Sequence, residues 1–331
     1  MKSMQIVLNS YGCALTRDNE GFVVCTTDGS QRIPATNIDS ILVSKGAQIS
    51  SDAVMLAVEN EIEILFTDKS GNVVGRVWSP KYGSVSTIRK GQLNFVFGKE
   101  AVAWIKEELQ QKIENQQALL LMMDSASEEK STYRKKTIAK LEDYKTKIKG
   151  LEGDIVNDIA ASLRGWEGIA SKYYFDAMNL YLPERFRFAK RSQHPAEDVA
   201  NAFLNYGYGL LYAKVEGALI KAGIDPYIGV LHRDDYNRPV LAYDVIERYR
   251  VWVEYVVWNL LNQNVVSDDF YSTRNDGSVW LEGLGRRVVI QSLNDYLADV
   301  TTLNGVSRSR EYQIFLYAQN LAQQFKKLNP L

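Results

Sequence analysis

The sequence predicts an α+β protein with a small N-terminal β domain at residues 1–80, a linker at 81–93 and a larger, mainly α-helical domain at 94–331. Two patterns predict this division. Short apolar segments separated by turn residues fill the first part of the chain, which is typical of strands. From about Lys90 onward, apolar residues recur at three- and four-residue steps, as at Ile105, Leu109 and Ile113, which is typical of helices. With 331 residues, 46% of them hydrophobic, the chain is long enough to form two cores.

The predicted β domain contains five apolar segments and one helix. Turn residues at 28–29 and 70–72 separate the segments, which read QIVLNSY, FVVCTT, SILVS, EIEILFTD and VVGRVW. The helix is expected near residues 51–60. Residues 79–84 contain proline, glycine and serine, and the strand pattern ends there, so we expect the chain to pass into the linker at this point.

The first part of the helical domain, residues 94–149, is rich in lysine and glutamate with intermittent aliphatic residues. This pattern fits one long helix or a pair of helices. We expect a helical hairpin with its joint near Asp124 and Ser125, because a broken helix packs more readily on one compact domain.

Composition argues against several classes of protein. A net charge of -1 does not suit a chain that coats nucleic acid by bulk charge, so DNA contacts have to come from local basic patches. Cys13 and Cys25 are too few for a disulfide framework and are expected to be buried strand thiols. Two histidines exclude a multi-histidine zinc centre, and no phosphate-binding P-loop is present. The sequence shows neither an apolar leader nor a bilayer-length run, so we expect a cytoplasmic protein without a membrane partner.

Polar residues in largely apolar surroundings are the candidates for chemistry. His232 ends the apolar segment GIDPYIGVLH, although by itself such a histidine is more often structural than a ligand. Asp244 is expected to begin a helix that runs to about Asn262, with Glu247 three residues later on the same face. A carboxylate in surroundings such as VLAYDVIERYRVWVEYVVW needs a partner or a metal, and a solvated helix flank is the alternative.

Glu167 is a third candidate. It lies between Trp166 and Gly168 on a helix that we expect to be packed on several sides, because apolar residues surround it in the sequence. It has either a special partner or an ordinary ion pair with Arg164 or Lys172, and the pattern alone does not decide between them.

Five ordered blocks resemble the signature blocks of one family. They are EGIASKYYF from Glu167, DVANA at 198–202, LNYGYGLLYA from Leu204, GIDPYIGVLH ending at His232, and YDVIERYR around Asp244. In this order and at these separations they resemble the CRISPR-associated protein Cas1 family, the integrases of spacer acquisition. A looser resemblance extends from the β segments through RKGQL at 89–93 to SVWLEGLGRRVVIQSLNDYL at 278–297.

By this resemblance the catalytic metal ligands are Glu167, His232 and Asp244, while Glu247 and Arg250 match nearby positions that orient the ligands. Two carboxylates and one imidazole suit Mn²⁺ or Mg²⁺ and leave coordination positions open for water and phosphate oxygens.

The sequence departs from the family pattern at three positions, none of them an implied ligand. Lys172 stands where arginine is common, and Val199 and Val251 stand where proline is common. These departures concern local backbone shape rather than catalysis.

The resemblance implies a metal-dependent DNA integrase and endonuclease of CRISPR adaptation. Such an enzyme joins the 3′ ends of short DNA fragments to the boundary of a CRISPR repeat by transesterification, and water in place of the 3′-hydroxyl gives hydrolysis. The resemblance also implies a homodimer with contacts in the β domain and assembly with the small Cas2 protein. A transposon-type integrase of the same lineage and a catalytically idle DNA-binding scaffold subunit are the alternatives.

Two basic segments are candidates for the DNA contact. We expect branched DNA or short duplex fragments to be held through their phosphates by Lys172, Arg187, Lys190 and Arg191. The lysines and arginine between residues 130 and 149 are interpreted mainly as a solvated helix face.

Overall fold

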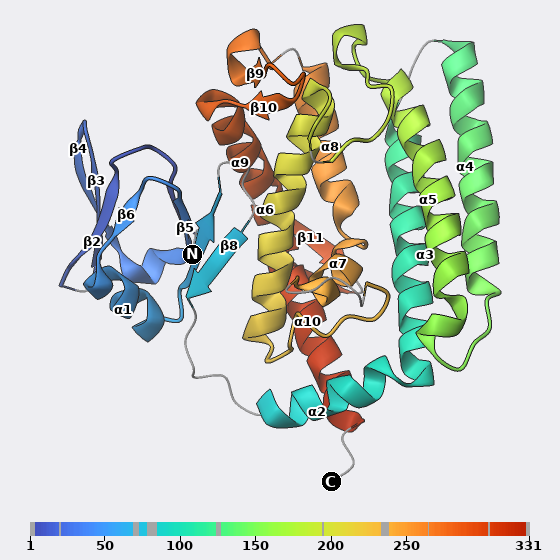
Figure 1. Cartoon of the computed structure of the whole chain (residues 1–331), viewed down its shortest axis with the longest axis horizontal. Helices are drawn as coiled ribbons and strands as arrows, with labels where there is room; N and C mark the ends of the chain where they lie inside the picture. Colours follow the sequence, from blue (N-terminus) through green and yellow to red (C-terminus); the bar gives the residue numbers. More distant parts are fainter. Residues whose placement is uncertain are drawn as a thin grey trace. The chain divides into compact units, whose positions relative to one another are not determined.

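The computed structural model (Figure 1) divides into two compact units, an N-terminal unit at Met1–Gly83 and a C-terminal unit at Ser84–Leu331. No described helix is both long enough and apolar enough to cross a membrane. The structure describes residues 4–19, 21–68, 73–77, 85–123, 127–193, 195–232, 238–263, 265–303 and 305–328.

The N-terminal unit contains two sheets and one helix. In the first sheet, in the order β1-β5-β7-β8, the neighbours pair in parallel except for the antiparallel edge strand β8. In the second sheet, in the order β4-β3-β2-β6, the pairs are antiparallel except for β2 with β6. The elements are β1 (Met4–Leu8), β2 (Ala14–Asp18), β3 (Gly21–Thr26), β4 (Gly29–Pro34), η1 (Ala35–Asn37), β5 (Ile38–Ser44), β6 (Gln48–Ile49), α1 (Ser51–Glu59), β7 (Glu63–Thr67) and β8 (Val73–Val77).

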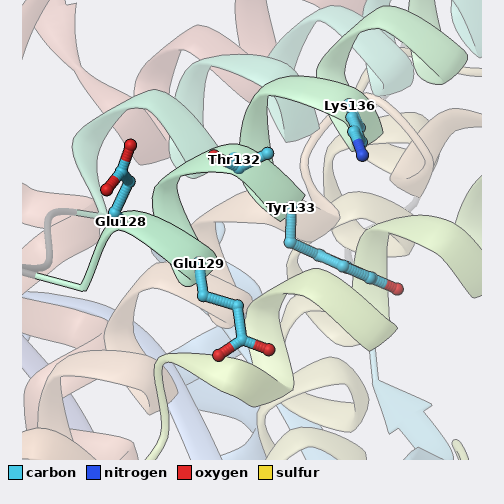
Figure 2. Close-up of a pocket in the computed structure, with 5 residues that line it drawn as sticks. All are labelled: Glu128, Glu129, Thr132, Tyr133 and Lys136. Atoms are coloured by element: carbon cyan, nitrogen blue, oxygen red, sulfur yellow. The ribbon is translucent and has the colours of Figure 1, made fainter.

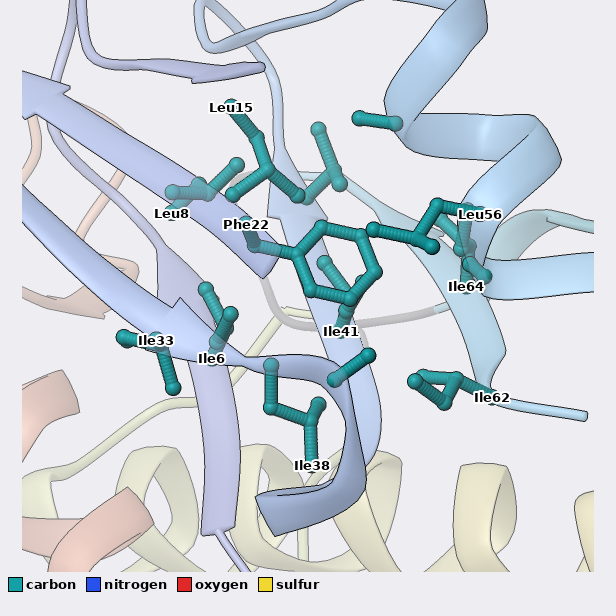
Figure 3. Packing of buried hydrophobic residues seen from close by; sticks show 14 of the residues in the cluster. Ile6, Leu8, Leu15, Phe22, Ile33, Ile38, Ile41, Leu56, Ile62 and Ile64 are labelled. Carbon is teal, nitrogen blue, oxygen red and sulfur yellow. The ribbon is translucent and has the colours of Figure 1, made fainter. Parts of the chain in front are cut away.

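The core of this unit lies around Phe22, which is fully buried (Figure 3). Leu15, Ile41 and Ile64 are also fully buried in the same cluster, and they come from β2, β5 and β7. Leu56 adds a contribution from α1, whose first turn is capped by the Ser50 hydroxyl accepting the Ala53 N–H at 3.2 Å. Alternate residues of each strand therefore supply one apolar cluster.

Each of the five predicted strand segments contains a strand, and the helix predicted near residues 51–60 is α1, so these predictions are confirmed. Strands β2, β4 and β6 were not predicted. The sequences of β2 and β4, ALTRD and GSQRIP, are mostly polar, and they are held by their ladders with β3 rather than by an apolar pattern.

The prediction for the cysteines is only partly right. Cys13 is buried but precedes β2, and its thiol donates to the Ser10 carbonyl at 2.9 Å. Cys25 lies in β3, half-buried. Both are free thiols.

The C-terminal unit is mainly helical. Helix α3 packs against both α4 and α5, which lie side by side in Figure 1, and α6 packs against α7, α8, α9 and α10. The elements are α2 (Val85–Val96), α3 (Lys99–Met122), α4 (Glu128–Lys149), α5 (Val156–Leu180), η2 (Glu184–Phe186), α6 (Val199–Lys221), α7 (Val240–Ile246), α8 (Arg250–Asn262), η3 (Asp268–Phe270), β9 (Tyr271–Thr273), β10 (Val279–Leu281), α9 (Gly283–Ala298), β11 (Val300–Leu303), β12 (Val306–Ser309) and α10 (Arg310–Lys327).

The α+β fold class is confirmed, and so is the helical hairpin, because α3 ends at Met122 and α4 begins at Glu128. The predicted joint at residues 124–125 lies outside the described residues, as do the turn at 70–72 and the linker stretch 79–84.

Residues 85–93, which we assigned to the linker, instead form most of α2. The buried face of α2 carries Ile88 and, beyond this range, Phe95, whereas Leu93 is 46% exposed.

Helix α6 is buried around most of its circumference and carries the Gly207-Tyr208-Gly209 segment in its middle. A Cβ atom on Gly207 would lie 2.5 Å from Val253 Cγ1, so this glycine allows α6 and α8 to pack closely. The segment therefore has a packing role inside the unit.

Candidate metal centre

Asp244 is a fully buried carboxylate on α7 that holds the end of the preceding loop. Its Oδ2 accepts the backbone N–H groups of Val230 at 2.7 Å and Leu231 at 3.2 Å, and its Oδ1 accepts that of His232 at 3.3 Å. Its side chain has no exposed surface. The carboxylate therefore faces inward, where it fixes the backbone at residues 230–232.

His232 is oriented by the same carboxylate. Its Nδ1 lies 2.7 Å from Asp244 Oδ1, and 38% of its side chain is exposed. The tautomer with the proton on Nδ1 satisfies Asp244 and leaves the lone pair of Nε2 free for a ligand. Burial by itself lowers the pKa of His232, but the hydrogen bond and charge of Asp244, with the charge of Glu247, outweigh burial and raise it.

Glu167 and Glu247 meet at the ammonium group of Lys112, which α3 carries. Lys112 Nζ donates to Glu167 Oε1 and lies 2.5 Å from Glu247 Oε2. Ser171 Oγ also donates to Glu167 Oε1, at 2.8 Å. The side chains of Lys112 and Glu247 are 7% and 6% exposed, whereas that of Glu167 is 28% exposed. The cluster is therefore buried at its centre and reaches solvent on the Glu167 side.

Arg250 fixes the other oxygen of Glu247. Its Nε donates to Glu247 Oε1 at 2.8 Å, and its guanidinium also donates to the Tyr212 hydroxyl at 2.7 Å. Burial by itself raises the pKa of Glu247, but the charges of Arg250 and Lys112 outweigh it and lower the pKa to about 2. Glu247 is therefore a carboxylate throughout the neutral range.

A break between two helices directly follows Glu247. We predicted one helix from Asp244 to about Asn262, which is wrong, because α7 ends at Ile246 and α8 begins at Arg250. The Tyr249 N–H donates to the Ile246 carbonyl at 2.8 Å, a three-residue step that tightens the turn. Glu247 itself keeps helical backbone angles, so it stands about one turn after Asp244, at the corner where α7 ends.

The helix that carries Glu167 is also less enclosed than predicted. Packing on several sides is wrong for α5, since Ala161 is exposed and Ile169 is 42% exposed. The ordinary ion partners that we considered are engaged elsewhere. Arg164 donates to the Leu231 carbonyl at 2.8 Å, and Lys172 Nζ lies 3.2 Å from an Asp176 oxygen. The partner of Glu167 is Lys112, a residue far away in the sequence.

The structure brings Glu167 and Glu247 together at Lys112 and places His232 within range of the Glu247 charge, whereas the Asp244 carboxylate is held by the backbone of residues 230–232. In the described part of the chain, no three histidine, cysteine, aspartate or glutamate side chains are grouped to hold a metal ion. Two features account for this: the Asp244 carboxylate is engaged by backbone N–H groups, and the Lys112 ammonium lies between the other two carboxylates.

Sequence reasoning missed Lys112, although a signal was present. Lys112 and Glu108 lie on the buried face of α3 that also carries Ile105 and Leu109. Charged residues at apolar-face positions require buried partners, and Glu108 has one in Arg248, which donates to both of its oxygens at 2.8 and 2.9 Å.

A second buried carboxylate, Glu254 on α8, was also missed. It accepts the hydroxyl groups of Tyr174 at 2.6 Å and Tyr208 at 2.7 Å. Burial raises the pKa of Glu254. The Arg250 guanidinium lies 4.9 Å from the centre of the Tyr208 ring, so this layer supports the residue that orients Glu247.

The predicted DNA contacts have different surroundings. Lys172, Arg187 and Lys190 are exposed, and Lys190 is 3.3 Å from a Glu197 oxygen across the surface. Arg191 instead points inward. Its guanidinium donates to the side chains of Asn201 and, at 2.9 Å, Asn205. DNA contact by these residues stays a prediction, and Arg191 has a structural role whichever surface binds DNA.

The basic face of α4 is the other candidate surface. Its exposed residues include Lys135, Lys136 and Lys140, and Lys140 lies 4.1 Å from the centre of the Tyr173 ring. A hollow at the start of this helix is shown in Figure 2, where the labelled side chains carry both signs of charge. Its lining residues are Glu128, Glu129, Thr132, Tyr133 and Lys136, none of which belongs to the Glu167 cluster.

Comparison with known families assigns the chain. Residues 6–295 match the model of the family described as CRISPR associated protein Cas1. The protein therefore belongs to the Cas1 family, and the resemblance on the five sequence blocks is confirmed.

Individual relatives agree with this assignment. The CRISPR-associated endonuclease Cas1 1 of Archaeoglobus fulgidus is 30% identical over 331 residues, covering 96% of this chain and 95% of the relative. A Thermus thermophilus CRISPR-associated endonuclease Cas1 is 46% identical, but over only 36% of this chain and 36% of its own.

Two solved structures share the fold. A Cas1 protein from Thermotoga maritima has a TM-score of 0.80 at 21% identity, covering 98% of this chain and 97% of the other. A casposase bound to its integration product has a TM-score of 0.83 at 20% identity, covering 99% of this chain and 91% of the other. These two likenesses concern the fold alone.

Proposed function

We propose that this chain is a metal-dependent DNA endonuclease and integrase of CRISPR adaptation. The observation that carries the proposal is the meeting of Glu167 and Glu247 at Lys112, with the charge of Glu247 also acting on His232, in a chain whose family relatives are named endonucleases. The reaction is attack of a 3′-hydroxyl on a phosphodiester of the repeat boundary, which forms a new phosphodiester and releases the former 3′ oxygen. Water in place of the hydroxyl gives strand cleavage.

By their chemistry the side chains suit a divalent ion once the Lys112 ammonium leaves the two glutamates, provided that the roles of Asp244 and Glu247 are exchanged relative to those implied by the resemblance. Glu167 and Glu247 already share one cation, the Lys112 ammonium, so their geometry accepts positive charge between them. His232 supplies Nε2, while Asp244 holds the opposite side of the ring. When bound, Mn²⁺ or Mg²⁺ would polarise the scissile phosphodiester. The proposed ligands are therefore Glu167, His232 and Glu247, with Asp244 and Arg250 orienting them.

The exchange of roles is tested by neutral substitutions. Glu167→Gln, Glu247→Gln and His232→Ala should each lower Mn²⁺-dependent cleavage and joining of branched DNA by about a hundredfold or more, because the ligands act as one site. Asp244→Asn should cost about ten- to a hundredfold, since it disturbs a residue that orients a ligand. Glu142→Gln, an exposed change on α4, is the control. Near wild-type activity of Glu247→Gln, with none in Asp244→Asn, would restore Asp244 as the ligand.

We also propose that the protein works as a homodimer assembled with the small Cas2 protein on DNA. Support comes from the fold that the chain shares with the Cas1 part of a Cas6-RT-Cas1–Cas2 complex, at a TM-score of 0.81 and 22% identity over 98% of this chain. Co-purification of the chain with Cas2 encoded in the same locus tests this partner. The same gene neighbourhood distinguishes an adaptation enzyme from a transposon-type integrase.

A further inference from the structure

Among the ion pairs of the described residues, Lys112 alone contacts both glutamates of the proposed metal site, Glu167 and Glu247. It reaches them from α3, whereas Glu167 belongs to α5 and Glu247 to the α7–α8 corner. Its ammonium group is therefore a cation held inside the site by the chain itself.

The charges at this position balance without a metal. Glu167 and Glu247 contribute two negative charges, and Lys112 and Arg250 contribute two positive charges within contact distance. A divalent ion placed between the same carboxylates would leave an excess of positive charge in a largely buried place, even when the Asp244 carboxylate behind His232 is counted. Such an imbalance is strongly unfavourable away from bulk water. Additional negative charge, or removal of the ammonium, is needed for tight metal binding.

A phosphodiester supplies negative charge at this place, and Lys112 has somewhere to go. The lysine stem is flexible, so the ammonium can leave the carboxylates without movement of α3. One helical turn further along the same face is Gln116, which is 1% exposed. Its amide oxygen and nitrogen have no hydrogen-bond partner among the described residues. Side chains four residues apart on a helix are neighbours, so Gln116 Oε1 offers the displaced ammonium an acceptor.

We propose that Lys112 makes divalent-metal binding at this site depend on DNA, by occupying the space between Glu167 and Glu247 until a phosphodiester arrives. In the absence of DNA the ammonium and the metal exclude each other. When a DNA phosphate enters, its charge compensates the metal, and the ammonium moves off the carboxylates. This inference rests on the proposed function, because it concerns the same metal site and the same substrate.

The test measures Mn²⁺ affinity rather than activity. Free Mn²⁺ is followed by electron paramagnetic resonance while MnCl₂ is titrated into the full-length chain, with and without branched DNA. The variants are Lys112→Met, which removes the charge and keeps most of the stem, and Lys106→Met as the matched control. Lys106 lies on the same helix but donates to the Leu151 carbonyl at 2.6 Å instead of joining the cluster. Glu167→Gln with DNA gives the background of Mn²⁺ bound by the DNA itself.

Wild-type protein and Lys106→Met should bind Mn²⁺ at least about tenfold more tightly with DNA than without it. Lys112→Met should bind Mn²⁺ about tenfold more tightly than wild type in the absence of DNA, and DNA should then add little. The proposal is overturned if Lys112→Met binds Mn²⁺ more weakly than wild type or keeps the full dependence on DNA. If this variant does not fold, equal affinity of the wild type with and without DNA overturns it.

Failure of the proposed function gives a different result. If Glu167→Gln binds as much Mn²⁺ as wild type under both conditions, the metal does not bind at this site. That outcome removes the proposed ligands and the role of Lys112 together. If Glu167→Gln abolishes Mn²⁺ binding but Lys112→Met leaves the Mn²⁺ affinity and its dependence on DNA unchanged, only the inference about Lys112 is overturned.

Discussion

His232 and Asp244 are joined twice, because Asp244 Oδ1 lies 2.7 Å from His232 Nδ1 and also accepts the His232 backbone N–H at 3.3 Å. The carboxylate therefore fixes both the ring and the backbone of the same residue. Its other oxygen accepts two further backbone N–H groups. Asp244 thus connects the local fold of residues 230–232 with the direction of the His232 ring.

Removing this carboxylate should damage the fold as well as the site. In Asp244→Ala the backbone donors at residues 230–232 lose their acceptor, so we expect the free energy of unfolding to fall by about 2–4 kcal/mol. Urea denaturation followed by circular dichroism measures this loss. Glu167→Gln, a more exposed change in the same site, should cost much less. Equal stability of Asp244→Ala and wild type would show that the Asp244 carboxylate does not hold the backbone at residues 230–232.

Gly229 should be intolerant of a side chain. A Cβ there would lie 2.7 Å from the His232 carbonyl oxygen and 2.8 Å from Val240 Cγ2, so backbone has to shift. Gly229→Ala should displace His232 and lower metal-dependent cleavage by about a hundredfold, since small misplacements of a catalytic group are costly. Gly168→Ala, where a Cβ meets nothing within 4 Å, is the matched control on α5. Full activity of Gly229→Ala would mean that the loop can move without displacing the histidine.

The DNA surface can be located with charge changes that avoid Arg191, whose guanidinium supports the loop from within. If Arg187 and Lys190 hold DNA, replacing both with alanine should weaken branched DNA of different sequences by a similar factor. The slope of log affinity against log salt should become shallower by about 0.9 for each lost contact.

The matched comparison replaces Lys135, Lys136 and Lys140 on α4 with alanine, and we expect a smaller effect. Fluorescence anisotropy over a salt series measures both variants. A larger loss of affinity and slope in the α4 variant would place the DNA on that helix. Arg191→Ala should instead lower stability by about 1–3 kcal/mol, because it leaves buried amide groups unsatisfied.

Acid stability should depend on the ion pair between α6 and α10, in which Lys214 Nζ lies 2.7 Å from Glu311 Oε1. Burial by itself raises the pKa of Glu311, but the charge and hydrogen bond of Lys214 outweigh it and lower the pKa. A lowered carboxyl pKa stabilises the fold above the unfolded value and loses that contribution as pH falls through the folded value.

Glu311→Gln should therefore be less stable than wild type at pH 7, by less than about 1 kcal/mol because the Glu311 side chain is 39% exposed. The stability difference between Glu311→Gln and wild type should begin to shrink below about pH 4, where an unperturbed glutamate titrates. It should be gone once the pH is below the lowered pKa of Glu311. Thermal unfolding at a series of pH values measures it. A difference that grows on acidification would contradict the assignment.

Association should be independent of the metal. We expect the proposed homodimer to persist in a chelator, because its contacts are predicted in the β domain, whereas the proposed ligands all belong to the C-terminal unit. Light scattering at micromolar concentration, with and without chelator, measures the mass. A monomer, or a dimer that dissociates when metal is removed, would contradict the prediction.

The sequence by itself determined the α+β class, five strand segments, the α3–α4 hairpin and the family. These features depend on local apolar periodicity and on ordered blocks such as those around Glu167 and His232, which a single chain displays directly. The polar strands β2 and β4 were missed because their stability comes from pairing with β3, a relationship between segments rather than a pattern within one.

Only the tertiary structure decided the roles within the site. Asp244 and Glu247 are three residues apart in one sequence block, and spacing on a straight helix would have put both on one face. In the structure the Asp244 carboxylate accepts the backbone N–H groups of residues 230–232, whereas the Glu247 carboxylate, one turn later at the end of α7, meets Lys112. Lys112 itself is brought from α3 across more than fifty residues of chain to Glu167. Buried charges have to be paired, and their partners are chosen by packing in space, which sequence separation does not record.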